Sequence, residues 1–76
     1  MKPLTRKDRN IQIVLHRLSG QPGRVVAENY QISKGRIYQI EYRTLQRLRR
    51  RAGIREPLAI GKDNETIREL IEQLPE

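Results

Sequence analysis

Between Ser33 and Gly53 the chain reads KGRIYQIEYRTLQRLRRRA, a stretch without proline whose apolar residues recur at helical spacing. Ser33 suits the N-cap position, because its hydroxyl can accept hydrogen bonds from the free backbone N–H groups of a first turn. At about 1.5 Å per residue, a helix of this length extends for roughly 25 Å. The stretch therefore predicts one long amphipathic helix over residues 33–51. Its broad apolar side consists of Ile37, Ile40, Thr44, Leu45 and Leu48.

Two polar groups cover the rest of this predicted helix. A narrow basic stripe consists of Arg36, Arg43, Arg47 and Arg50. A second group faces away from the apolar side and consists of Gly35, Gln39, Tyr42 and Gln46. Tyr38 and Tyr42 lie four residues apart at the edge of this polar face, where they could stack together, contact phosphates or anchor a protein partner.

Two shorter helices are expected before the long one. The first should begin at Thr5, since Thr5 and Asp8 have the spacing of a capping box, and should end at Ser19-Gly20. A turn at Gln21-Pro22-Gly23 leads to a short second helix over about residues 24–30. The apolar stripe of the first helix is Ile11, Val14, Leu15 and Leu18, and that of the second is Val26, Ala27 and Tyr30.

The C-terminal part of the chain predicts a connector and a fourth helix. Residues 54–62 contain a Pro and a Gly and read as a connector, whose Leu58 and Ile60 should pack against the bundle. Asp63 or Asn64 should cap the fourth helix. Residues 63–76 thus form an acidic amphipathic helix that either packs on the domain or makes a homodimer contact. Its apolar stripe is Ile67, Leu70, Ile71 and Leu74.

These elements predict an all-α fold, a compact bundle of about four helices in which residues 1–53 form a helix-turn-helix domain. A chain of 76 residues is enough for one domain, and no alternating β-branched run predicts a strand. No apolar run approaches the roughly 18 residues that span a bilayer, and no signal peptide follows Met1. We therefore expect a cytoplasmic protein, in a bacterium or a bacterial host cell, without a membrane partner.

The residue types also exclude several kinds of chemistry. The chain has no Cys and a single His, His16, so a thiol nucleophile, a disulfide and a metal cluster built on these residues are excluded. The sequence offers no Ser/His/Asp set, no paired carboxylates in a plausible cleft and no phosphate-binding loop. We expect neither an enzyme nor a cofactor.

Charge gives the strongest indication of a partner. The formal net charge is +7, and it is unevenly distributed. Residues 1–62 hold 15 basic and 4 acidic side chains, a net charge of +11, whereas residues 63–76 hold 1 and 5, a net charge of −4. A basic body joined to an acidic tail favours a polyanionic partner, and nucleic acid above all.

The link between the second and third predicted helices is unusually short. Only Gln31 and Ile32 precede the Ser33 cap, a spacing typical of a helix-turn-helix. Ala27 is the small residue needed where the second helix crosses the third closely. Such a turn often carries Gly, so Gln31 either takes a left-handed conformation at a cost of about 1 kcal/mol or the turn is built differently. An ordinary helical hairpin is the alternative. The apolar residues expected to lock the corner are Val26, Tyr30, Ile32, Ile37 and Ile40.

The segment ISKGRIYQIEYRTLQRLRR resembles region four of bacterial primary sigma factors, the domain that reads the promoter −35 element. The family pattern there is V-T-R-E-R-I-R-Q-I-E-x-x-A-L-x-K-L-R. The identical positions are Arg36-Ile37 and Gln39-Ile40-Glu41, and the register continues through Leu45, Leu48 and Arg49. The likeness covers about residues 6–51 and implies a helix-turn-helix that docks its second helix in the major groove.

This resemblance also shows where the chain departs from the family. Three of the family's groove-facing positions, Arg, Glu and Arg, are occupied here by Lys34, Gly35 and Tyr38, and only Gln39 is retained. Because Gly35 can neither accept from cytosine nor donate to guanine, the −35 preference is not expected to be inherited. The candidate base-reading residues are Lys34, Gly35, Tyr38 and Gln39. The candidate phosphate- or partner-binding residues are Arg6, Arg36, Tyr42, Arg43, Arg47 and Arg50.

Two functions follow as hypotheses. The first is a small transcription regulator that binds double-stranded DNA through the helix starting at Ser33. One such helix reads only a few base pairs, so the protein must dimerise or be held on DNA by another contact. The second is a phage-type regulator that uses the sigma-like scaffold to bind bacterial RNA polymerase and to inhibit or redirect transcription.

Overall fold

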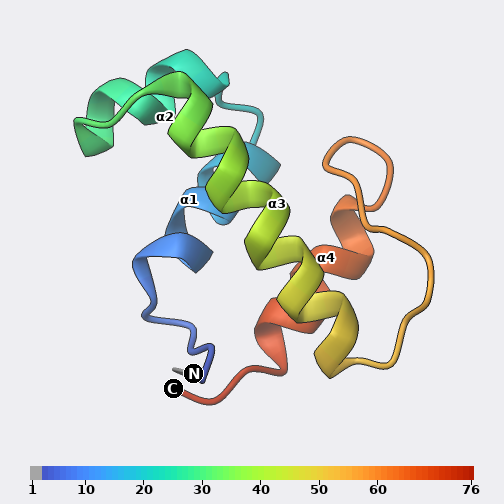
Figure 1. The fold of residues 1–76 in the computed structure, drawn as a ribbon. Coiled ribbons are helices and arrows are strands. Elements are labelled where there is room, and N and C mark those ends of the chain that lie inside the picture. The colour runs from blue at the N-terminus through green and yellow to red at the C-terminus, as the bar shows by residue number, and fades with distance from the viewer. Residues whose placement is uncertain (1–2) are drawn as a thin grey trace.

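The computed structural model describes residues 3–76 and, within that range, contains four α helices and no strand (Figure 1). The chain folds into a body of about 32 × 26 × 18 Å. The predicted all-α bundle is therefore confirmed. None of the described helices is long and apolar enough to cross a bilayer. The helices are α1 (Arg9–Leu18), α2 (Gly23–Tyr30), α3 (Lys34–Arg51) and α4 (Asn64–Glu72).

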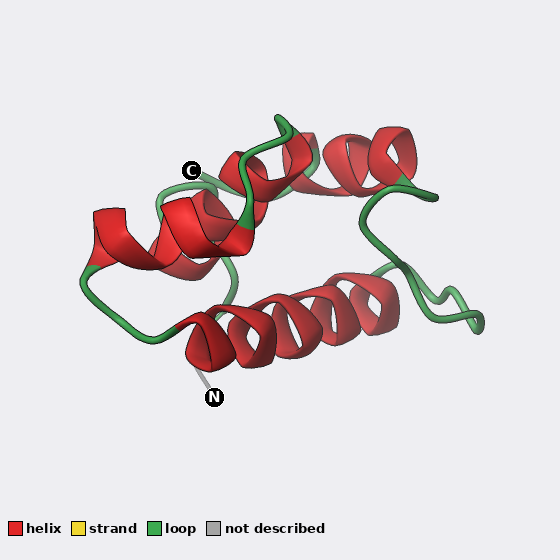
Figure 2. Cartoon of the chain, turned by 90° about the horizontal axis from the view of Figure 1, so that it is seen from above, coloured by secondary structure: helices red, strands yellow, loops and turns green. Residues whose placement is uncertain are grey.

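Helix α3 extends across the molecule, and each of the other three helices packs against it (Figure 1); seen from above, α3 lies along one side of the molecule (Figure 2). Its N-terminal half packs on α2, and its C-terminal half packs on α4. The five residues predicted to form its apolar side are all buried. The Ser33 cap is also confirmed, since its Oγ accepts a hydrogen bond from the backbone N–H of Arg36 at 3.1 Å.

Two apolar clusters hold the helices together, one at each end of α3. The first joins α1 and α4 to the C-terminal half of α3 and consists of Leu4, Ile11, Val14, Leu18, Leu45, Leu48, Ile67, Ile71 and Leu74. The second joins α1 and α2 to the N-terminal half of α3 and consists of Ile13, Val26, Ala27, Ile37 and Ile40, with Tyr30 and Ile32 against its edge.

The start of α1 differs from the prediction. Asp8, not Thr5, is the N-cap, and its side chain accepts from the backbone N–H of Asn10 at 2.8 Å. Thr5 instead begins a turn in which its carbonyl accepts from the N–H of Asp8 at 3.2 Å. The reason is local: the carboxylate of Asp8 accepts directly from the free N–H of Asn10, so the helix begins about one turn later than predicted.

The turn between α2 and α3 takes the first of the two predicted forms. Gln31 has φ 56° and ψ 42°, a left-handed conformation, and no other non-glycine among residues 3–76 has a positive φ. The N–H of Ile32 donates to the carbonyl of Ala27 at 3.1 Å and closes the end of α2. Gln31 thus holds a conformation that costs a side-chain-bearing residue about 1 kcal/mol.

The C-terminal helix packs on the domain. Ile67 and Ile71 lie in the first apolar cluster, and Leu58 and Ile60 of the connector pack against it as expected. Asp63 takes the N-cap position but forms no capping hydrogen bond with its side chain. Its Oδ2 instead accepts from the N–H of Ala59 at 2.9 Å, so the carboxylate holds the connector against the start of α4.

The two ends of the described chain meet beside α4. The N–H of Arg6 donates to the carbonyl of Pro75 at 3.2 Å. The Arg6 guanidinium lies 3.2 Å from Glu72 Oε2 and 3.0 Å from Glu76 Oε1. Both carboxylates are largely exposed, so these ion pairs add little stability each, but they neutralise Arg6 within the molecule.

Candidate nucleic-acid interface

The first two turns of α3 present an open polar surface. Lys34, Gly35 and Gln39 are all exposed on the side that faces away from the core. A Cβ added to Gly35 would meet no heavy atom within 4 Å, so packing inside the protein does not require glycine at this position. The surface around Gly35 is therefore free for a partner to approach closely.

Gln39 is oriented by its neighbour one turn earlier. Nη1 of Arg36 donates to Oε1 of Gln39 at 3.2 Å. The amide oxygen is thus engaged, and the amide nitrogen remains free to donate. In a major groove this nitrogen would suit the acceptors of guanine or thymine.

Tyr38 is less free than its position in the sequence indicates. Its ring is 44% exposed, and the Arg17 guanidinium lies 5.7 Å from the ring centroid. A Cβ added to Gly23 would lie 2.9 Å from the Tyr38 hydroxyl oxygen, so the phenol rests directly on the first residue of α2. Tyr38 therefore links α1, α2 and α3 with one face and offers the other to solvent.

The basic stripe of α3 is exposed along its whole length. Arg36, Arg43, Arg47 and Arg50 are all exposed. The ion pairs found among residues 3–76 join Arg6 and Arg17 to carboxylates and involve none of the stripe. Four unpaired guanidinium groups on one helix face therefore form a surface suited to phosphates.

Arg6 does not belong to this surface. It is paired with Glu72 and Glu76 at the end of the molecule where the termini meet, whereas the candidate base-reading residues lie at the end where α2 meets α3 (Figure 1). The structure thus brings Lys34, Gly35, Gln39 and the arginine stripe together on α3 and separates Arg6 from them.

The sequence analysis missed the ion pair that fixes α1 to α3. Nε of Arg17 donates to Oε1 of Glu41 at 2.8 Å, and Nη1 of Arg17 donates to the carbonyl of Gln21 at 2.8 Å. Glu41 is buried, with its side chain 9% exposed. A signal existed, because Glu41 follows Ile37 by four residues and so lies on the apolar side of α3, where a carboxylate needs a cation from another helix.

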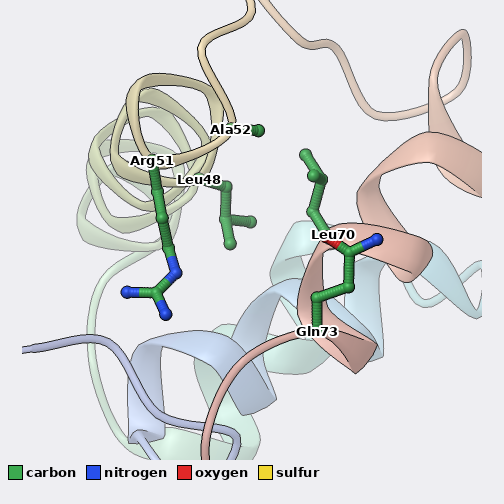
Figure 3. Close-up of a pocket in the computed structure, with 5 residues that line it drawn as sticks. All are labelled: Leu48, Arg51, Ala52, Leu70 and Gln73. Atoms are coloured by element: carbon green, nitrogen blue, oxygen red, sulfur yellow. The ribbon is translucent and has the colours of Figure 1, made fainter.

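A small pocket lies between the end of α3 and α4 (Figure 3). It has a volume of about 200 Å³; Leu48 of α3 and Ala52 at its C-cap lie on one side, and Leu70 of α4 and Gln73 at its C-cap lie on the other. Arg51 lies at its edge. Among residues 3–76 no group of three His, Asp or Glu side chains could hold a metal ion, here or elsewhere.

Comparisons with protein families, with curated proteins and with solved structures find no match for this chain. The resemblance to sigma region four therefore depends on the residues of ISKGRIYQIEYRTLQRLRR themselves, and a function must be argued from the surface of α3.

Proposed function

We propose that the chain is a small helix-turn-helix transcription regulator that binds duplex DNA through the first turns of α3. The observation that supports this most is the arrangement of α2, the left-handed Gln31 and the capped α3, with the polar start of α3 left exposed. Such an arrangement allows a helix to enter the major groove by its N-terminal residues.

Each part of the exposed surface has a role in this proposal. Lys34 and Gln39 donate to base edges, and Gly35 lets a base edge approach the helix backbone closely. The stripe of Arg36, Arg43, Arg47 and Arg50 binds phosphates and sets the register of the helix in the groove. Arg6 contributes nothing, because its charge is already neutralised by Glu72 and Glu76.

The acidic part of the chain does not obstruct this docking. Helix α4 packs beside the C-terminal half of α3, away from the reading positions (Figure 1). In the monomer Ile67, Ile71 and Leu74 of its apolar stripe are buried and Leu70 is partly buried, so a homodimer through residues 63–76 would have to use mainly the exposed polar face of α4. Tight binding by one such domain then requires a second protein contact or a second copy joined by other surfaces.

A salt titration tests the proposal. If the stripe and its neighbours neutralise about four to six phosphates, log K should fall with log salt concentration with a slope of roughly −4 to −5. Fluorescence anisotropy with a labelled random duplex would measure it, and footprinting on genomic fragments would locate a preferred site. No binding at about 50 mM salt, or a slope near zero, would exclude duplex DNA as the partner.

A specific observation favours the second candidate, a regulator that binds bacterial RNA polymerase. Gly35 carries no reading group, and Tyr38 is held against Gly23 and Arg17, so two of four reading positions are poorly placed to select bases. A pull-down from bacterial lysate treated with nuclease separates the two functions. Recovery of polymerase subunits without DNA would favour this candidate, whereas failure together with a footprinted site would favour the first.

A further inference from the structure

Two aromatic side chains lie exposed on a basic helix. Tyr42 is 66% exposed and Tyr38 is 44% exposed, and they are the large apolar side chains that the described part of the chain leaves in water. The third tyrosine, Tyr30, packs against the second apolar cluster and meets His16 edge to face, with 5.8 Å between the ring centroids. Tyr38 packs one face on Gly23 and Arg17, whereas packing does not explain the exposed ring of Tyr42.

Both tyrosines border one groove. It has a volume of about 280 Å³, and its lining comes from α1, α3 and the connector. The aliphatic part of this lining consists of Leu45 and Ile60. The connector takes part through Ile60, which lies on the same side of α3 as Tyr38 and Tyr42. The volume of the groove is near the lower limit of ligand sites, about 300 Å³, and so suits a single small group.

The groove combines three kinds of chemistry. The phenol rings and the aliphatic floor offer flat apolar surface. Glu41 contributes a carboxylate that, among residues 3–76, accepts a hydrogen bond from Arg17 through Oε1, which leaves Oε2 able to accept another. Two cations belong to this side of α3: Arg17, which lines the groove, and the exposed Lys34, which lies one turn before Tyr38 on the same helix.

We propose that this groove binds an unpaired nucleobase of single-stranded DNA or RNA. The base stacks on Tyr42, its amino group donates to Glu41, and a flanking phosphate reaches Lys34. Stacking on an exposed aromatic ring inside a basic surface is the usual means by which proteins hold single strands. This site shares Lys34 with the proposed duplex interface, but its stacking ring, Tyr42, has no role in that interface, so the two sites can be tested separately.

A nucleotide fits this groove better than a peptide. An acidic peptide would bring its carboxylates toward Glu41, and a basic peptide would bring its cations toward Arg17 and Lys34. A nucleotide presents an anionic phosphate to the cations, a flat face to the rings and amino donors to the carboxylate. Only the nucleotide satisfies all three groups of the groove at once.

The test uses the full chain and its Tyr42→Leu and Tyr42→Phe variants. Because Tyr42 is exposed, neither change should alter the melting temperature by more than about a degree or two. Anisotropy is measured with labelled oligodeoxycytidine of about a dozen nucleotides, with the matching oligocytidine RNA, with oligodeoxythymidine and with a random duplex. Phe keeps an aromatic ring on which a base can stack, whereas Leu is apolar but has no ring. Comparing the two variants therefore separates the contribution of stacking from that of apolar contact.

Tyr42→Leu should weaken binding of the single-stranded cytidine probe about 5- to 100-fold, and Tyr42→Phe should change it less than about 3-fold. Cytosine carries an exocyclic amino group and thymine does not, so the thymidine probe should bind the full chain more weakly. If Tyr42→Leu loses more affinity for the DNA probe than for the RNA probe, the groove prefers single-stranded DNA; the reverse result shows a preference for RNA. Duplex affinity should stay within about 3-fold for both variants.

Three results would overturn the proposal. Equal single-strand affinity for Tyr42→Leu and the full chain would mean that no base stacks there. An equal loss on duplex and single strand would make Tyr42 part of the duplex interface. If Tyr42→Leu no longer recovers polymerase from a nuclease-treated lysate but still binds single strands as the full chain does, the groove binds a protein. The duplex probe is measured separately. If the proposed function fails, the full chain does not bind duplex; if this site fails, Tyr42→Leu binds single strands as well as the full chain does.

Discussion

Helices α3 and α4 are both amphipathic, but the polar face of α3 is basic and that of α4 is acidic. Helix α4 buries its apolar stripe in the first apolar cluster, and Glu72 near its end pairs with Arg6. Helix α3 also buries its apolar side, but its arginine stripe has no carboxylate partner among residues 3–76. The difference indicates that α4 serves to complete the monomer, whereas α3 both builds the core and leaves its arginine stripe without a carboxylate partner in the described part of the chain.

Removal of residues 63–76 should have the largest effect, because it strips α4 from the core. Ile67, Ile71 and Leu74 are almost fully buried, and each buried aliphatic side chain contributes about 1.5–3 kcal/mol. The summed loss approaches the whole stability of a small domain, about 5–15 kcal/mol. We expect the truncated chain to lose its cooperative thermal transition in circular dichroism. A truncated chain that melts as the full chain does would mean that α4 is a free acidic arm.

A matched control keeps the helix and changes only its polar face. Glu65 and Glu69 are exposed on α4 and lie outside the ion pairs. Replacing both with Gln should leave the free energy of unfolding within about 0.5 kcal/mol. If this double change destabilises the protein as strongly as Ile67→Ala, the acidic face and not the apolar stripe holds α4 in place.

The Arg17–Glu41 pair should give the next largest effect, since it joins α1 to the middle of α3. Breaking a fully buried pair costs about 3–5 kcal/mol, and partial exposure of Arg17 lowers our expectation for Glu41→Ala to about 2–3 kcal/mol. Urea denaturation would measure it. Arg17→Met combined with Glu41→Leu should recover much of the loss, because it leaves no buried charge unpaired. A double variant less stable than Glu41→Ala would contradict that explanation.

Sequence reasoning predicted most of the fold because the apolar stripes are periodic and the breaks between them are strong. It located α3 and its Ser33 cap, and it placed the small Ala27 where α2 packs on α3. It placed the start of α1 one turn too early, because Thr5 and Asp8 both suit a cap and only the folded backbone selects between them. Boundaries of this kind depend on which side chain reaches a free N–H.

The candidate site was predictable only in part. Exposure of Lys34 and Gln39 follows from helical periodicity alone. The pairing of Arg6 with Glu72 and Glu76 does not, because it joins segments at opposite ends of the sequence. The same holds for Tyr38, whose contact with Gly23 depends on how α2 crosses α3. Long-range contacts of single side chains are set by packing, which a local pattern does not encode.

Base reading and phosphate binding should separate on α3. Gln39→Ala should cost about 1–3 kcal/mol on the preferred site and little on random duplex, because the lost amide contacts a base edge. Arg43→Ala should weaken both alike and reduce the salt slope by about 1. Arg6→Ala serves as the control cation, and its pairing with α4 predicts a much smaller change in DNA affinity. Equal effects of Arg6→Ala and Arg43→Ala would show that total charge, not the stripe, governs binding.

Gly35→Ala should give the smallest change in stability. Whether the variant is more or less stable shows whether the backbone at this position needs glycine. Gly35 lies in the first turn of α3, where Gly is less favourable than Ala by roughly 0.5–1 kcal/mol, and the added methyl group would meet nothing within 4 Å. The variant should therefore be slightly more stable in urea denaturation. If a base edge or a partner backbone approaches Gly35, the same variant should bind that partner more weakly. Higher stability with unchanged affinity for both duplex DNA and polymerase would place the partner elsewhere on α3, whereas lower stability would show that the backbone at Gly35 needs glycine for its own conformation.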